Sequence, residues 1–178
     1  QRYTQEFEEM FLEDRFGALS LPDSNGVPVA LEGGEWLALF SPDVAVAHEL
    51  IDLINTANST IDFLAFSYTS DDIAGAMLDR LAAGVRVRGV IESDQAFATG
   101  AQYESLLQGG VDVRLDGNPG AMHHKVILVD DEIVVCGSYN FTRSAEERND
   151  ENVLIAVYPA LAAEFLIEFE KIYAQAVP

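Results

Sequence analysis

The sequence is poor in cysteine, in lysine and in long apolar runs. Its 178 residues include one cysteine, Cys136, and two lysines. A single cysteine excludes an intramolecular disulfide and a metal site built from several thiolates, and its apolar neighbours favour a buried small side chain over a reactive thiol. No apolar stretch reaches the roughly 18 residues that a membrane-spanning helix needs. We therefore expect a soluble chain.

Basic charge is also scarce. Ten Lys and Arg residues stand against 30 Asp and Glu, which gives a formal net charge of −20. Such a surface repels the DNA backbone at long range, so nucleic-acid affinity would require a local basic site. The acidic charge can also be interpreted as a solvating surface without a functional role, as in secreted proteins or proteins from high-salt settings. The sequence does not indicate the compartment. The chain begins with Gln1 without a recognisable leader, so we expect that any targeting segment was removed or never existed.

The order of the predicted elements indicates one α/β domain, since the length suits a single core. Ser41 is predicted to cap a helix with Pro42 at its first position, and Ser70 to cap the next helix. The alternation of elements predicts a mixed β-sheet flanked by helices on both faces. We expect strands at 36–40, 61–67, 85–91, 111–115, 125–129, 133–136 and 152–157, and helices at 42–57, 71–83, 101–108 and 159–176.

The first 34 residues do not follow this alternation of strands and helices. Residues 1–17 are predicted as a helix, 18–34 as an irregular connector with a short extended piece, and 35–178 as the main α/β domain. Residues 6–11 match residues 168–173 in residue class at five of six positions. Either two amphipathic helices agree by chance, or the first helix is the tail of a preceding, similar domain.

Two polar clusters are predicted to meet through a hairpin. His123 and Lys125 are two residues apart, which places both side chains on one face of an extended segment. Asp130 follows the strand, a tight turn reverses the chain, and the next strand leads to Ser138 and Asn140 beside the histidine. One phosphate could therefore contact both clusters.

These residue types suit phosphodiester chemistry. A phosphodiester is anionic and a poor electrophile, so it needs donors on its non-bridging oxygens, which Lys125, Ser138 and Asn140 can supply. A neutral imidazole such as His123 is a suitable nucleophile when a carboxylate holds its other nitrogen. Glu151, at the mouth of the last strand, is the candidate for that carboxylate.

The segment His123-x-Lys125-(x)4-Asp130-(x)6-Gly137-Ser138-x-Asn140 resembles the HKD motif of the phospholipase D superfamily. Residues 61–70 and 84–88 are similar to the strand-helix-strand of its small bacterial endonucleases and mitochondrial single-motif members, and the resemblance covers roughly residues 36–173. It implies a phospholipase D/nuclease-like fold in which two motifs meet at a twofold axis. One histidine would form a phosphohistidine and the other would protonate the leaving oxygen, without metal or other cofactor.

Carried over to this chain, the resemblance implies one set of site residues. The catalytic set is His123, Lys125, Asp130 and Glu151, and Lys125, Ser138 and Asn140 bind the substrate phosphate. Within it, Asp130 would fix the geometry of the motif and Glu151 would orient the imidazole. His124 is expected on the opposite face, and His48 on the surface.

Only one motif is present, so the second histidine would come from a homodimer partner or from a second HKD domain of the same protein. The first hypothesis for the substrate is nucleic acid, because the compact architecture resembles the nuclease branch. The alternatives are hydrolysis or transfer at phospholipid headgroups, and an inactive dimerising module.

Overall fold

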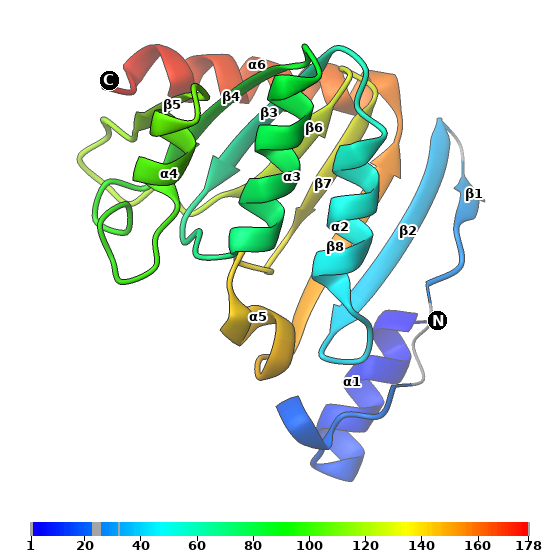
Figure 1. Ribbon diagram of the computed structural model, residues 1–178. Helices are drawn as coiled ribbons and strands as arrows, with labels where there is room; N and C mark the ends of the chain where they lie inside the picture. Colours follow the sequence, from blue (N-terminus) through cyan, green and yellow to red (C-terminus); the bar gives the residue numbers. More distant parts are fainter. Residues whose placement is uncertain (1, 23–25, 32, 178) are drawn as a thin grey trace.

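A single mixed β-sheet forms the centre of the molecule (Figure 1). The computed structural model describes residues 2–22, 26–31 and 33–177, and within them the sheet has eight strands in the order β1-β2-β8-β7-β6-β3-β4-β5. β3, β4 and β5 run parallel, and the other neighbours pair antiparallel. The strands are β1 Val29–Leu31, β2 Gly34–Ser41, β3 Thr60–Ala65, β4 Arg86–Ile91, β5 Asp112–Leu115, β6 Lys125–Val129, β7 Ile133–Gly137 and β8 Glu151–Val157.

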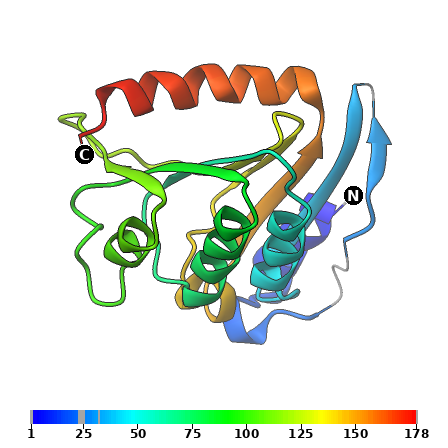
Figure 2. The same ribbon diagram turned by 45° about the horizontal axis from the view of Figure 1, so that its top comes forward.

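Helices cover both faces of the sheet, as predicted. α2, α3 and α4 lie on one face and the long helix α6 crosses the other (Figure 2). α1 and α5 lie near the end of the sheet where β2 ends and β8 begins (Figure 1). The helices are α1 Arg2–Glu13, α2 Val46–Asn55, α3 Asp71–Ala82, α4 Tyr103–Gln108, α5 Arg143–Glu147 and α6 Pro159–Gln175, with a 3₁₀ turn at Gly17–Leu19. No helix in the described ranges is long and apolar enough to cross a membrane.

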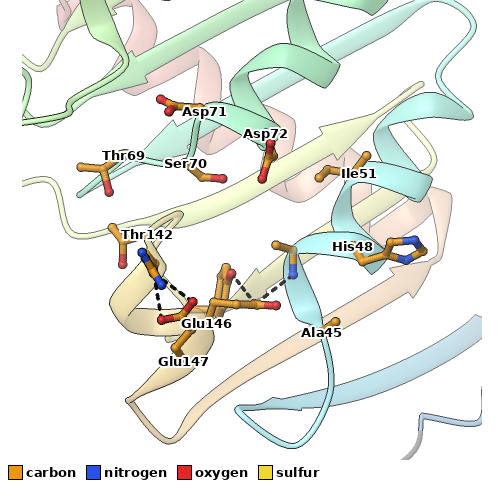
Figure 3. A pocket seen from close by; sticks show the side chains of 13 residues that line it. Ala45, His48, Ile51, Thr69, Ser70, Asp71, Asp72, Thr142, Glu146 and Glu147 are labelled. Carbon is orange, nitrogen blue, oxygen red and sulfur yellow. Dashed lines mark hydrogen bonds and ion pairs between the residues drawn. The ribbon is translucent and has the colours of Figure 1, made fainter.

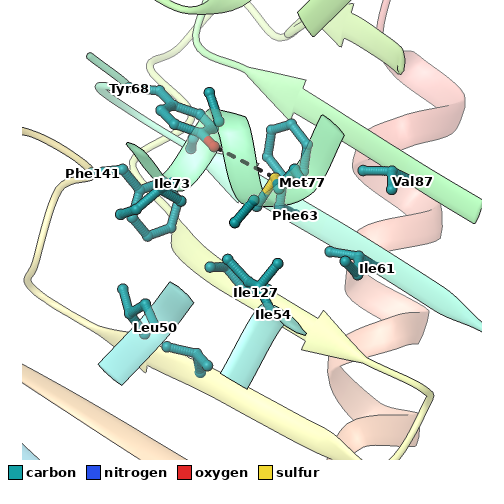
Figure 4. Packing of buried hydrophobic residues seen from close by; sticks show 14 of the residues in the cluster. Leu50, Ile54, Ile61, Phe63, Tyr68, Ile73, Met77, Val87, Ile127 and Phe141 are labelled. Atoms are coloured by element: carbon teal, nitrogen blue, oxygen red, sulfur yellow. Dashed lines mark hydrogen bonds between the residues drawn. The ribbon is translucent and has the colours of Figure 1, made fainter. Parts of the chain in front are cut away.

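Two apolar layers hold the helices to the sheet. Alternate strand residues point to opposite faces, so Phe63 and Ile127 pack under α2 and α3 (Figure 4), whereas Leu64 and Val126 pack under α6. Burial on both faces explains why the central strands are continuous apolar runs rather than alternating ones. The layers fix β6 and β7, which carry the motif, at the centre of the sheet.

The start of α2 corrects one prediction. Ser41 does not cap this helix; it is the last residue of β2, and α2 begins at Val46. The Ser41 side chain is buried and its Oγ donates a hydrogen bond to the carbonyl oxygen of Ala145 (2.6 Å), so it is not available to a helix N-terminus. The second cap is confirmed, because Ser70 Oγ accepts a hydrogen bond from the Ile73 amide (3.3 Å).

The N-terminal elements are close to those predicted. α1 forms where a helix was expected, and the extended piece of the connector is β1, an edge strand paired with β2. The 3₁₀ turn at Gly17–Leu19 was not predicted. Residues 23–25 and 32 of the predicted connector and residue 178 of the predicted domain lie outside the described residues.

Candidate active site

The predicted site forms where three strands meet at one end of the sheet. Lys125 begins β6, Gly137 ends β7 and Glu151 begins β8, and the antiparallel register places these ends side by side. They border a pocket of about 480 Å³. The residues lining it are His123, Lys125, Gly137, Ser138, Asn140, Glu151 and Asn152. Tertiary structure thus gathers His123, Glu151 and all three predicted phosphate-binding residues.

Lys125 supplies positive charge from a buried position. Its residue is only 7 % exposed, and Nζ donates a hydrogen bond to the His123 carbonyl oxygen (2.9 Å) and lies 4.9 Å from the centre of the Phe66 ring. Burial lowers the pKa of the Lys125 ammonium, and the nearby Glu151 carboxylate opposes this effect. Lys125 is the one lysine or arginine among the described residues that line the pocket, so it would be the cation that meets an anionic phosphate there.

His123 is exposed at the pocket and is held by its neighbours. Its ring meets the Phe66 ring edge-on, with centroids 4.5 Å apart. The preceding Met122 amide donates a hydrogen bond to the buried Glu92 carboxylate (2.5 Å), which fixes the loop before β6. The sequence prediction missed Phe66 and Glu92. The only signal for Phe66 is the register that pairs Ala65 with Lys125, and a single sequence does not show register.

Ser138 and Asn140 point polar groups at the same space. Ser138 Oγ accepts hydrogen bonds from the Asn152 amide (3.0 Å) and from Asn152 Nδ2 (3.2 Å), which leaves the hydroxyl proton for a ligand. The Asn140 carboxamide oxygen is buried and accepts no hydrogen bond from any described residue. A buried polar atom without a partner is rare, and a ligand at the pocket is one explanation for it.

Gly137 is required by the close approach of β8. A Cβ atom at this position would fall onto the carbonyl oxygen of Asn152. The same approach lets the Ser138 amide donate to that carbonyl oxygen (3.0 Å). A side chain at Gly137 would therefore separate the two strands that deliver Ser138 and Glu151 to the pocket.

Glu151 reaches the pocket but not the histidine. Its Oε1 accepts a hydrogen bond from Asn149 Nδ2 (2.9 Å), and over the described residues no hydrogen bond joins Glu151 to His123. Burial lowers the pKa of Lys125, and the charge of the Glu151 carboxylate opposes that lowering. The predicted role of Glu151 in orienting the imidazole stays a prediction.

Asp130 is the one predicted catalytic residue that lies outside the pocket. It follows the last residue of β6, so a five-residue strand, roughly 17 Å, separates it from Lys125. Asp130 and Asp131 have φ values of 54° and 57°, as a tight type I′ hairpin turn requires. At this distance the Asp130 carboxylate cannot touch a phosphate held by Lys125, in line with the expectation that Asp130 fixes the geometry of the motif.

The Asp130 carboxylate instead joins the hairpin to the start of β3. It accepts hydrogen bonds from the backbone amides of Asn58 (2.8 Å), Ser59 (2.7 Å) and Thr60 (2.9 Å), and from Ser59 Oγ (2.8 Å). Partial burial alone would raise the pKa of Asp130, but these hydrogen bonds outweigh that effect and lower the pKa to about 2. This geometry supports the structural role that the family resemblance implies.

The other two histidines lie elsewhere. His124 lines a hollow beneath α6 together with Leu64 and Val126, on the opposite face to Lys125. Its Nδ1 is buried without a partner among the described residues. His48 is exposed on α2 and lies 3.5 Å from the Asp52 carboxylate. Both positions agree with the sequence analysis.

A second pocket, of about 530 Å³, opens between α2, α3 and α5 (Figure 3). Asp71, Asp72, Glu146 and Glu147 line it, and none of the predicted site residues does. Glu146 accepts a hydrogen bond from the Tyr139 hydroxyl (2.8 Å), and Glu147 pairs with Arg143 (2.9 Å). Four carboxylates disfavour a phosphate, so this pocket is not the candidate site despite its larger size.

One acidic cluster could offer ligands to a metal. Within the described ranges, Glu6, Glu9 and Asp43 are the only group of three such side chains that come within 4.8 Å of one another. None of them lines the His123 pocket, and Glu9 accepts a hydrogen bond from the Leu21 amide (2.7 Å). The prediction of a metal-free site is not tested by this arrangement.

The fold and the pocket together define an α/β protein of the HKD phosphodiesterase class. Residues 50–173 match the family described as "Cardiolipin synthase, PLD-like domain". The chain therefore belongs to the phospholipase D superfamily, as the motif predicted.

Curated relatives carry two kinds of name. The chain is 34 % identical over 153 residues to mitochondrial cardiolipin hydrolase of Homo sapiens, covering 86 % of this chain and 57 % of the relative. It is 37 % identical over 123 residues to the Chlamydomonas reinhardtii protein of that name, covering 69 % of this chain and 55 % of the relative. It is 32 % identical over 127 residues to phospholipase D of Rickettsia bellii, covering 71 % and 63 %. The chain thus spans between half and two thirds of these relatives.

Solved structures match the fold over most of the chain. Nuc from Salmonella typhimurium, a phospholipase D family member, superposes with a TM-score of 0.74 at 29 % identity and covers 79 % of this chain and 95 % of Nuc. NucT from Helicobacter pylori superposes with a TM-score of 0.70 at 20 % identity, covering 80 % and 98 %, and supports the fold alone.

Proposed function

We propose that this chain carries one half of a metal-independent phosphodiesterase site that cleaves nucleic acid through a phosphohistidine intermediate. One observation carries the proposal. An exposed imidazole, a buried ammonium group, a hydroxyl and a carboxamide, from His123, Lys125, Ser138 and Asn140, border a single pocket. This set contains a nucleophile together with donors for the phosphate oxygens.

The reaction takes two displacements at phosphorus. A ring nitrogen of His123 attacks the phosphorus, a nitrogen–phosphorus bond forms, and the bond to the leaving oxygen breaks as a second imidazole protonates that oxygen. A water molecule then attacks the phosphohistidine, gives its proton to the second imidazole and releases His123. Lys125, Ser138 and Asn140 hold the non-bridging oxygens, whose negative charge rises in each transition state.

The second imidazole requires a second copy of the site. His123 is the one histidine that lines the pocket among the described residues, and His124 and His48 face other surroundings. A twofold arrangement places two identical pockets opposite each other and so supplies two histidines. A homodimer and a second HKD domain of a longer protein both satisfy this requirement.

The substrate is the finer part of the proposal. Nucleic acid is supported by the compact architecture, which the sequence shares with the single-motif nuclease branch, and by the polar lining of the pocket. The second candidate is a phospholipid headgroup. The observation in its favour is the similarity to relatives that are named cardiolipin hydrolase.

Parallel assays with three substrates test the proposal. Bis-p-nitrophenyl phosphate, single-stranded DNA and phosphatidylcholine vesicles are incubated with the protein in excess EDTA. We expect cleavage of the first two, and a loss of about 10³-fold or more in His123→Ala because the nucleophile is removed. His124→Ala is the matched control, since this neighbour faces the opposite side of the sheet.

Each contrary outcome has a definite meaning. Activity abolished by EDTA would refute the metal-independent mechanism, and equal activity of His123→Ala and the wild type would refute the nucleophile. Cleavage of phosphatidylcholine without cleavage of DNA would overturn the nucleic-acid assignment in favour of the second candidate. Inactivity on all three substrates, by a protein shown to hold two copies of the site, would support the inactive dimerising module.

A further inference from the structure

A smaller hollow opens beside the His123 pocket, between α1 and the start of β8. Its volume is about 270 Å³, and two of the residues that line it, Glu151 and Asn152, also line the His123 pocket. The two spaces therefore share a wall. A phosphate held by Lys125 would place one of its ester substituents beside this hollow.

Aromatic rings form one side of the hollow. Tyr3 and Phe7, four residues apart on one face of α1, line it together with Met10 and Phe40. The Tyr3 ring meets the Phe40 ring edge-on, with centroids 4.9 Å apart. Tyr3 and Phe7 are 52 % and 56 % exposed, whereas Glu9 on the same helix is 7 % exposed. A helix that buries a carboxylate and exposes its rings presents an interaction surface.

The other side of the hollow is rich in hydrogen-bond acceptors. The carboxylates of Glu6, Asp150 and Glu151 and the carboxamide of Asn152 line it. The Tyr3 hydroxyl donates a hydrogen bond to Asn152 Oδ1 (3.4 Å), which joins the aromatic side to the polar side. Carboxylate oxygens accept hydrogen bonds and repel anions, so this side suits an uncharged group that carries N–H donors.

We propose that the hollow binds the nucleobase next to the scissile phosphate and selects bases that carry an amino group, an assignment that rests on the proposed function. The two faces of a base are apolar and stack on aromatic side chains, and its amino group donates to carboxylates. The hollow is smaller than the roughly 300–1,000 Å³ of pockets for drug-sized ligands, which suits a single ring system.

An alkyl chain fits this hollow less well. It would fill the aromatic side but cover the carboxylates without offering them a donor, and burial of unpaired charged groups is costly. The net charge of −20 also limits how far the nucleic-acid backbone can contribute to affinity beyond its contact with Lys125. Base stacking does not depend on that charge, so it can supply the rest of the affinity.

Calorimetric titration of the 178-residue chain in EDTA tests the assignment. The ligands are deoxycytidine 5′-monophosphate, deoxyuridine 5′-monophosphate and 2-deoxyribose 5-phosphate. We expect the cytosine nucleotide to bind at least about tenfold more tightly than the sugar phosphate, because its base stacks in the hollow. It should also bind about fivefold or more tightly than the uracil nucleotide, which has a carbonyl oxygen in place of the amino group.

One pair of variants locates the effect. Phe7→Ser should reduce the tenfold gain from the base to less than about threefold, because a stacking surface is lost. Phe97→Ser is the matched control and should keep the gain. Its ring is 65 % exposed, and Phe97 is not among the described residues that line either space. Both rings lie largely in solvent, and circular dichroism checks that both variants fold.

These measurements need no cleavage, so their outcome differs from that of the activity assays. A base that adds to affinity through Phe7 would support the assignment even in a protein that cleaves no substrate. Sugar phosphate that binds through Lys125 while the base adds nothing would refute the assignment and leave the proposed function standing. Equal affinities for the cytosine and uracil nucleotides would overturn the selection of an amino group. Hexyl phosphate that binds more tightly than the cytosine nucleotide, and loses this advantage in Phe7→Ser, would assign the hollow to an alkyl chain instead.

Discussion

Replacing Asp130 by Asn should weaken the fold and leave the chemistry largely intact. The carboxylate accepts hydrogen bonds from three backbone amides at the start of β3. It is separated from Lys125 by the length of strand β6. An Asn side chain keeps one acceptor oxygen but turns an NH₂ group toward one of those amides, so one hydrogen bond and the charge are lost. Asn also tolerates the positive φ of this position, so the turn itself is retained.

The pKa gives the size of the effect. Lowering the pKa of Asp130 from 3.8 to about 2 corresponds to roughly 2.4 kcal/mol of unfolding free energy at neutral pH, and solvent screening of this partly exposed group reduces it to about 1–2 kcal/mol. The folded-state pKa is the lower one, so this stability is fully present above about pH 4 and is lost as the pH falls toward 2. The difference between wild type and variant should therefore shrink in acid.

Thermal unfolding followed by circular dichroism from pH 7 to pH 2 measures this difference. We expect a melting temperature about 3–6 °C lower for Asp130→Asn at pH 7, and a kcat within about threefold of wild type at a temperature where both are folded. Asp131→Asn is the matched control, because Asp131 occupies the same turn with φ 57° and is exposed. A variant with unchanged melting temperature and a hundredfold lower kcat would refute the structural role.

Three further substitutions test the pocket and the core. Lys125→Gln should lower kcat/KM on bis-p-nitrophenyl phosphate by about 10²-fold or more. The control Lys171→Gln, at an exposed lysine paired with Glu168, should leave kcat/KM unchanged. Equal effects of the two variants would contradict the phosphate-binding role of Lys125. Phe66→Leu should lower kcat by about tenfold with a smaller change in KM, because the ring that holds the His123 imidazole is lost, and steady-state kinetics separates the two constants. Phe169→Ala should lower the unfolding free energy measured in urea by about 3–5 kcal/mol, and a loss below 1 kcal/mol would show that α6 is not packed as described.

Much of the fold followed from local signals. The central strands are short apolar runs, Ser70 caps α3 as predicted, and the Asp130-Asp131 pair makes the turn between β6 and β7. The failure at Ser41 has a physical cause. A serine before a proline is typical of a helix start, but burial beneath α5 and a bond to the Ala145 carbonyl keep this residue in β2.

For the candidate site, the sequence by itself determined which groups are available and roughly how they are spaced. The fixed spacing of His123, Lys125, Ser138 and Asn140 around a two-residue turn was enough to predict one shared pocket. Tertiary structure alone decided that the Phe66 ring holds the imidazole, that Glu151 lies near Lys125 without bonding His123, and that Asp130 secures the start of β3. These contacts depend on strand register and on side-chain directions across the sheet, which arise from packing of residues far apart in the chain and leave no local pattern.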